Sequence, residues 1–187
     1  IMKIQNTPIS DVKILMPQRF KDKRGFFAET YNSKKFFEAG FDINFVQDNH
    51  SLSHEPGTLR GMHYQSPPAA QAKLVRCGRG AIFDVVVDIR IGSPTYGKWF
   101  GYKLTAEDGD QIFVPIGFAH GFVSLEPNSE IIYKCTEYYA PEKEGTIRWD
   151  SCGIEWLLNS DPILSYKDSI AISLSDLNSP FIFGKNS

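Results

Sequence analysis

Three short stretches of the sequence concentrate side chains that suit acid–base or anion-binding chemistry. They are LRGMHYQ (Leu59–Gln65), VPIGFAHGF (Val114–Phe122) and LSYKD (Leu164–Asp168). The first holds a cation, a histidine, a tyrosine and an amide, and Lys73 follows soon after it. A neutral imidazole accepts protons near neutral pH, so His63 is a candidate general base. The alternative is a hydrogen-bonded structural histidine, which is common in β-rich chains.

The spacing of Arg60 and His63 conflicts with an ordinary strand. Successive side chains of a strand point to opposite faces, which would separate these two residues. A β-bulge adds one residue to a strand and resets the alternation. If Arg60 and His63 point into one site, we expect a bulge at Gly61.

The second stretch has the PxGxxH spacing, ending at His120, that cupin metal sites use in their second motif. The first cupin motif then needs two histidines one residue apart and a glutamate soon after. Here His63 is followed by Tyr64 and Gln65, and the chain has four histidines. A metal centre needs several convergent nitrogen and oxygen ligands. We therefore expect no metal, and a metal-dependent cupin is kept as the less favoured alternative.

Most of the remaining sequence has the pattern of short strands. In Ala81–Arg90 an apolar set alternates with a mixed set, which indicates a sheet with one side in a core. Turn residues separate further predicted strands at Trp99–Leu104, Gln111–Val114, Phe118–Leu125 and Glu130–Tyr139. One short helix is expected at Ser33–Ala39, capped by Asn32 or Ser33 and ended by Gly40. Such regularly spaced strands predict an all-β jelly-roll sandwich or barrel rather than a βαβ fold.

Two tyrosines share a face of the predicted strand Glu130–Tyr139. Residues two apart on a strand point the same way, so Tyr133 and Tyr139 would do so. If that face lines the mouth of a barrel, both hydroxyls can meet a ligand. The alternative is two core tyrosines whose hydroxyls are satisfied within the protein.

Composition and charge exclude several classes of protein. The 187 residues suit one compact domain, expected over 1–187 with a jelly-roll core at about 43–150. A net charge of −2 argues against a nucleic-acid partner. No stretch reaches the ~20 apolar residues of a membrane span, and the N-terminus lacks the apolar region of a secretory signal. Three widely spaced cysteines without a CxxC disfavour disulfides and zinc, so a cytoplasmic protein is expected.

Several longer motifs occur in a specific order. They are FKDKRGFFAE (Phe20–Glu29), FVQDNHS (Phe45–Ser51), GTLRGMHYQ (Gly57–Gln65), QAKLVRC (Gln71–Cys77), DVVVDIRIGSPTYGKW (Asp84–Trp99), VPIGFAHGF and LSYKD. Together, from Ile9 to Leu174, they resemble the dTDP-4-dehydrorhamnose 3,5-epimerase family, the epimerases of dTDP-L-rhamnose synthesis. A lone PxGxxH would be a weak signal, but this ordered set is a specific one.

The resemblance implies a cupin-like β-sandwich that acts without metal, nicotinamide or other cofactor. The implied ligand is a dTDP-linked 4-keto-6-deoxyhexose. The implied reaction inverts C3 and C5 of dTDP-4-dehydro-6-deoxy-D-glucose and yields dTDP-4-dehydro-L-rhamnose. The resemblance further implies a homodimer with exchanged N-terminal segments, so that some contacts to the nucleotide come from the partner subunit.

The resemblance also implies roles at matching positions. His63 resembles the general base, with Asp168 as its orienting partner. Tyr133 resembles the general acid on the opposite face of the sugar, and Lys73 lies near the C4 oxygen. The other matching positions contact nucleotide or substrate: Arg24, Glu29, Gln47, Asn49, Arg60, His120, Tyr139, Glu144 and Lys167. Among these, Arg60 and His120 would hold the diphosphate and sugar region.

The implied chemistry suits these residue types. A hydrogen beside a ketone is weakly acidic because the resulting carbanion delocalises onto the ketone oxygen as an enolate. A neutral histidine can remove it, and a lysine ammonium can stabilise the enolate oxygen. Inversion then needs an acid on the opposite face, and an arginine fork suits a diphosphate. Aromatic side chains could stack a thymine: Phe20, Phe26, Phe27 and Tyr139.

Other functions stay open at this point. Sister enzymes invert only C3 or only C5, and the segment Trp149–Trp156 departs from the turn often found in the family. A non-catalytic sugar-nucleotide-binding cupin is a further alternative, which the presence of both His63 and Tyr133 disfavours. Taken singly, Lys73 and Lys167 would be read as ordinary surface lysines.

Overall fold

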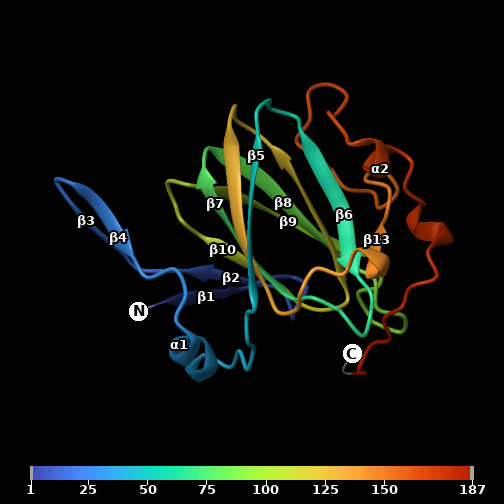
Figure 1. The fold of residues 1–187 in the computed structure, drawn as a ribbon, viewed down its shortest axis with the longest axis horizontal. Coiled ribbons are helices and arrows are strands. Elements are labelled where there is room, and N and C mark those ends of the chain that lie inside the picture. The colour runs from blue at the N-terminus through green and yellow to red at the C-terminus, as the bar shows by residue number, and fades with distance from the viewer. Residues whose placement is uncertain (1, 186–187) are drawn as a thin grey trace.

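Residues 2–185 are described by a computed structural model in which antiparallel strands build two main sheets (Figure 1). The first has the order β1 (Lys3–Asn6), β2 (Lys13–Met16), β10 (Gln111–Val114), β7 (Lys73–Arg79), β12 (Ser129–Cys135) and β5 (Gln47–Ser53). The second has the order β13 (Glu144–Thr146), β6 (Leu59–Gln65), β11 (Phe118–Ser124), β8 (Ala81–Asp88) and β9 (Trp99–Thr105). The expected all-β jelly-roll sandwich is confirmed.

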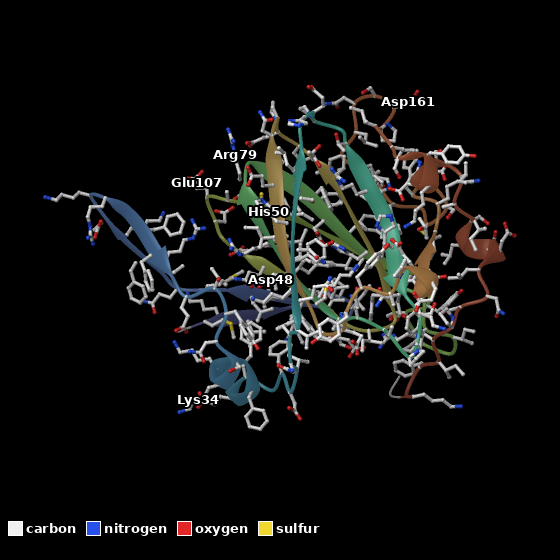
Figure 2. The ribbon with its side chains drawn as sticks, in the orientation of Figure 1. Lys34, Asp48, His50, Arg79, Glu107 and Asp161 are labelled. Atoms are coloured by element: carbon white, nitrogen blue, oxygen red, sulfur yellow. The ribbon has the colours of Figure 1, made fainter. Side chains whose placement is uncertain are left out.

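The main core lies between the two sheets. Both sheets contribute buried side chains to it, among them Val75, Ile112 and Ile131 from the first sheet and Ile82, Val86 and Phe122 from the second. Burying such a side chain contributes about 1.5–3 kcal/mol. On β5 the outward residues Asp48 and His50 are exposed and charged or polar (Figure 2), which leaves Gln47 and Asn49 on the inner face.

Both faces of β8 are buried, and this corrects the expectation of a single buried side. The mixed face, with Ile82 and Val86, points into the space between the sheets. The apolar face, with Val85 and Val87, packs in a second core cluster that includes Phe181. Ile147, Leu174 and Phe181 are among the C-terminal residues of this cluster. The C-terminal part of the chain also contains the short elements η1 (Pro141–Lys143), α2 (Tyr166–Ser169) and η2 (Leu174–Asp176). Periodicity within one strand cannot reveal a cover supplied by a distant segment.

The strand predicted at Glu130–Tyr139 ends earlier, at Cys135. Beyond it, Thr136 accepts a hydrogen bond from the backbone N–H of Ala72 through its hydroxyl (2.8 Å), and the chain turns away from the sheet. Tyr139 therefore lies in an irregular segment and does not share a strand face with Tyr133. The expectation that the two tyrosines share a strand face was wrong. The backbone around Tyr139 forms hydrogen bonds with side chains instead of pairing with a neighbouring strand.

The predicted short helix is confirmed as α1 (Ser33–Glu38). The Asn32 side chain caps it by accepting from the N–H of Lys35 (3.2 Å). Gly40 follows with φ of +91°, the left-handed conformation that ends helices at low cost. Phe36 is the buried anchor of the helix.

A hairpin formed by β3 (Arg19–Asp22) and β4 (Gly25–Ala28) projects from the body of the protein (Figure 1). Its aromatic residues Phe20, Phe26 and Phe27 are exposed. Arg19 anchors the base of the hairpin through a hydrogen bond to the carbonyl of Ala106 (2.8 Å). The hairpin thus places aromatic and charged side chains at a distance from the β-sandwich.

Two further observations concern residues 2–185 as a whole. No helix in this range is long and apolar enough to cross a membrane. Cys77, Cys135 and Cys152 are free and buried.

Candidate active site

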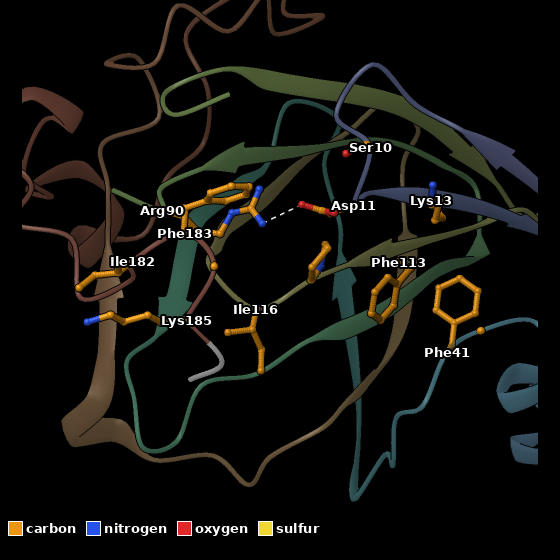
Figure 3. Close-up of a pocket in the computed structure, with 13 residues that line it drawn as sticks. Ser10, Asp11, Lys13, Phe41, Arg90, Phe113, Ile116, Ile182, Phe183 and Lys185 are labelled. Atoms are coloured by element: carbon orange, nitrogen blue, oxygen red, sulfur yellow. Dashed lines mark hydrogen bonds and ion pairs between the residues drawn. The ribbon is translucent and has the colours of Figure 1, made fainter. Parts of the chain in front are cut away.

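A cavity of about 320 Å³ lies between β6 and α2. Its lining combines three of the predicted chemical side chains, Arg60, His63 and Asp168, with Lys167. A larger cavity of about 800 Å³ lies elsewhere and contains none of the predicted site residues (Figure 3). There Arg90 is already paired with Asp11 (2.7 Å). The chemistry therefore favours the smaller cavity.

His63 and Asp168 form a short hydrogen-bonded pair. His63 Nε2 lies 2.6 Å from Asp168 Oδ1, and their side chains are 30% and 3% exposed. Ser165 caps α2 through the N–H of Asp168 (3.1 Å), and the N–H of Gly61 donates to Asp168 Oδ2 (3.3 Å). Burial raises the pKa of Asp168, but the hydrogen bond and charge of His63, together with the hydrogen bonds from Gly61 and Ser165, outweigh burial and hold that pKa below its usual value. The carboxylate stays charged and orients the imidazole, leaving the other ring nitrogen for proton transfer.

The predicted bulge at Gly61 is confirmed. His63 pairs with His120 on β11, but Arg60 pairs with Phe122, so β6 carries one residue more than its partner over this stretch. Arg60 and His63 consequently line the same cavity. Gly61 has φ of +135°, and a Cβ there would meet the Cα of the facing glycine at 2.6 Å. Only glycine fits this position.

A second buried histidine–aspartate pair lies beside the first. His120 Nε2 is 2.8 Å from Asp84 Oδ2, with side chains 7% and 0% exposed. Burial raises the pKa of Asp84, although His120 opposes the shift. Asp84 Oδ1 has no hydrogen-bond partner among the residues that the structure describes. Asp84 was missed from the sequence; its signal was a carboxylate on the mixed face of the β8 strand.

Lys73 opens β7 on the inner face of the first sheet. Burial lowers its pKa, and the negative charges of Asp84 and Glu144 partly offset this. Within residues 2–185 the ammonium has no hydrogen-bond or ion-pair partner, and it lies 6.0 Å from the centre of the Tyr133 ring. An unpaired cation in such a place is available to a bound anion or to a developing negative charge.

Tyr133 faces the same interior from β12. It pairs with Asn49 on one side and with Val75 on the other. Burial raises the pKa of Tyr133, while Asn49 and Arg60 lower it less. The phenol therefore stays protonated at neutral pH and can serve as an acid. It comes from the sheet opposite to that of His63.

Four of the predicted contact residues, Gln47, Tyr139, Glu144 and Lys167, form a connected group of hydrogen bonds and an ion pair. Gln47 Oε1 accepts from the N–H of Tyr139 (2.9 Å), and the Tyr139 hydroxyl donates to Glu144 Oε2 (3.1 Å). Glu144 also forms an ion pair with Lys167, which lines the His63 cavity. Burial raises the pKa of Glu144, but Lys167, the Tyr139 hydroxyl and the charge of His63 together outweigh burial and hold that pKa below its usual value.

Arg24 and Glu29 are not brought to the site within one chain. Arg24 lies in the hairpin turn, 84% exposed, and pairs with Asp22 (2.6 Å). Glu29 pairs with Lys35 (2.6 Å). Neither residue lines the cavity at His63. The hairpin that contains Arg24 projects from the sandwich on the side away from β6 and α2, which border the cavity at His63 (Figure 1), and Glu29 directly follows this hairpin.

The His63 and His120 pairs each bring one aspartate to one histidine. Among residues 2–185 no group of three or more His, Cys, Asp or Glu side chains is arranged to hold a metal ion. What the described side chains can do is proton transfer and the binding of anionic groups.

Comparison with known proteins agrees with this arrangement. The family model for dTDP-4-dehydrorhamnose 3,5-epimerase matches residues 6–176. The dTDP-4-dehydrorhamnose 3,5-epimerase of Salmonella typhimurium is 51% identical over 174 residues, covering 91% of this chain and 94% of that protein. An epimerase from Legionella pneumophila, solved with dTDP-4-keto-L-rhamnose, superposes with a TM-score of 0.92 at 45% identity, covering 95% of each chain.

A relative with narrower selectivity is also similar. A 3′-monoepimerase from Streptomyces bikiniensis, solved with dTDP-quinovose, has a TM-score of 0.86 at 36% identity, covering 91% of this chain and 87% of that one. The family model and the close relative span nearly the whole sequence. The chain is therefore an isomerase that belongs to the dTDP-4-dehydrorhamnose 3,5-epimerase family.

Proposed function

We propose that this protein converts dTDP-4-dehydro-6-deoxy-D-glucose into dTDP-4-dehydro-L-rhamnose by inverting C3 and C5, in dTDP-L-rhamnose synthesis. One observation carries the proposal. A histidine oriented by a buried carboxylate, His63, comes from one sheet, and a protonated phenol, Tyr133, comes from the opposite sheet. Inversion of a carbon requires a base on one face of the sugar and an acid on the other, and residues from two facing sheets can supply them.

The proton transfers follow from this arrangement. His63 takes the hydrogen from the carbon beside the ketone, and the electron pair of the broken C–H bond moves onto the C4 oxygen. Lys73 stabilises that enolate oxygen with its unpaired ammonium. Tyr133 then donates its proton to the opposite face of the same carbon. Exchange with solvent returns a proton to Tyr133 and removes one from His63, so no cofactor is consumed.

The rest of the pocket is assigned to binding. Arg60 is fixed by a hydrogen bond to the carbonyl of Leu52 (2.9 Å), and its fork suits a diphosphate. His120 holds the sugar region with Arg60. Nucleotide and substrate contacts are assigned to Gln47, Asn49, Tyr139, Glu144 and Lys167. Tyr139 is 58% exposed, as a surface for a stacked thymine should be.

A second copy of the chain completes the site in this proposal. Arg24, in the hairpin, and Glu29, directly after it, contact the nucleotide bound in the site of the partner subunit, since neither residue lines the His63 cavity of its own chain. The exposed aromatic residues Phe20, Phe26 and Phe27 support this, because such a cluster marks an interaction surface. The chain then acts as one epimerase domain, with a jelly-roll core at about 43–150, in the cytoplasm.

Proton NMR of dTDP-4-keto-6-deoxyglucose with the protein in D₂O tests the proposal. The expected result is loss of the C3 and C5 proton signals as deuterium enters both positions. Loss at one carbon only would assign a mono-epimerase, an alternative that the similarity to the 3′-monoepimerase keeps in view. Tight dTDP binding without any exchange would instead indicate a non-catalytic sugar-nucleotide-binding protein.

A further inference from the structure

An exposed aromatic ring stands here on a tightly held backbone. Tyr139 is 58% exposed, and the segment around it has no helix or strand. Yet the two successive peptide groups that flank it are bound by glutamine side chains. Tyr138 O accepts from Gln65 Nε2 (2.9 Å), Tyr139 N–H donates to Gln47 Oε1 (2.9 Å) and Ala140 N–H donates to Gln65 Oε1 (3.0 Å).

Gln65 holds the backbone on both sides of Tyr139. It is the last residue of β6 and only 5% exposed. Its Nε2 also donates to the carbonyl of Ala69 (2.5 Å), so both amide protons and the amide oxygen are engaged. A buried amide with every such bond made has one orientation, because any rotation would leave buried polar groups unpaired.

Gln65 also lies opposite a residue that binds the Tyr139 hydroxyl. Gln65 pairs across the strands with Glu144, which accepts from the Tyr139 hydroxyl and pairs with Lys167. The backbone of Tyr139 is thus tied to β6 and its hydroxyl to β13, the strand paired with β6. The ring is fixed at both ends while one surface stays open to solvent.

We propose that Gln65 is a positioning residue for nucleotide binding: it pre-orders Tyr139 as a stacking surface for the base. A ring that is already immobile loses less conformational freedom when a ligand stacks on it, and affinity rises accordingly. Gln65 itself touches no reacting atom. The inference rests on the proposed function in one respect, that the base of a dTDP-linked ligand stacks on Tyr139.

Calorimetric titration with dTDP alone provides the test, using Gln65→Leu, Tyr139→Ala and the double variant. Gln65→Leu should weaken dTDP binding about tenfold and raise the KM for the dTDP-linked sugar by a similar factor. The kcat should change by less than about twofold. In the Tyr139→Ala background the same substitution should change dTDP affinity by less than about twofold, because Gln65 acts through that ring. Gln71→Leu is the matched control. Gln71 donates to the carbonyl of Glu137 (2.7 Å), in the same segment but away from the peptide groups that flank Tyr139.

The outcomes separate the two proposals. If wild-type protein fails to bind dTDP, the proposed function fails. If it binds and Gln65→Leu binds equally well, the role of Gln65 is wrong. An equal loss in Gln71→Leu, or an undiminished loss in the Tyr139→Ala background, also overturns it. Should melting curves show that Gln65→Leu does not fold, Gln65→Asn keeps an amide too short to reach both sides of Tyr139 and carries the same expectations.

Discussion

His63 and His120 face each other across β6 and β11, and each is bonded to its own buried aspartate. The pKa values of the two aspartates are shifted in opposite directions. The pKa of Asp168 is held low by His63, whereas burial raises that of Asp84. His63 is also the more exposed of the two histidines and lines the cavity. The geometry therefore distinguishes a partly exposed histidine–aspartate pair at the cavity from a second pair that is buried.

His63→Ala should remove proton exchange at both sugar carbons. General-base catalysis contributes about 10²–10⁴ in rate, and a loss of that size is expected in the D₂O experiment. His50→Ala is the matched control, since His50 also pairs with a carboxylate, that of Glu130 (2.8 Å), but on the exposed outer face. Equal exchange in wild type and His63→Ala, or a comparable loss in His50→Ala, would contradict the assignment.

Asp168 should make the folding stability depend on acid pH. Its folded-state pKa is lowered, so its stabilising contribution is present above the unfolded pKa of about 3.9 and is lost as pH falls through the folded value. The melting temperature of the wild type should therefore exceed that of Asp168→Asn at pH 7, and this difference in melting temperature should become smaller below about pH 4. Asp48→Asn, at an exposed aspartate paired with Lys134, should show little difference at either pH. A difference for Asp168→Asn that is constant with pH would count against a charged Asp168.

We expect the charged Lys73 side chain to lower the free energy of unfolding, although proton exchange depends on it. Burial lowers its pKa, so the charged form is less favourable in the folded state than in the unfolded chain. Lys73→Met should then melt at or above the wild-type temperature, although proton exchange falls about 10²–10³-fold. The pH dependence has a fixed sign: the cost is present below the folded pKa and is relieved as pH rises towards the unfolded one. A marked fall in melting temperature with exchange retained would refute both parts.

The sequence predicted what local periodicity and turn residues control. The strand at Gln111–Val114 and the helix cap at Asn32 follow from alternation and side-chain chemistry over a few residues. The bulge at Gly61 was predictable because two residues required for one site stood on opposite faces of a regular strand. These features depend on neighbours in the chain.

What escaped prediction depends on contacts between distant segments. Asp84 stood on a recognised strand face, but alternation does not say that His120 would lie opposite. Tyr139 was placed on a strand because its spacing from Tyr133 fits period two. The amides of Gln47 and Gln65 bind the backbone there instead. The resemblance identified Arg24 as a contact residue, but it did not show that Arg24 lies away from the His63 cavity of the same chain.

The hairpin assignment predicts complementation between two defective chains. If Arg24 acts in the partner's site, a mixed dimer of His63→Ala and Arg24→Ala chains contains one intact site, which combines His63 of one chain with Arg24 of the other. Random mixing gives half mixed dimers with one good site each, or about a quarter of wild-type activity below saturation. The measurement is exchange rate after the two proteins are unfolded together and refolded, compared with each alone. If Arg24 acts within its own chain, every site lacks one of the two residues and mixing restores nothing.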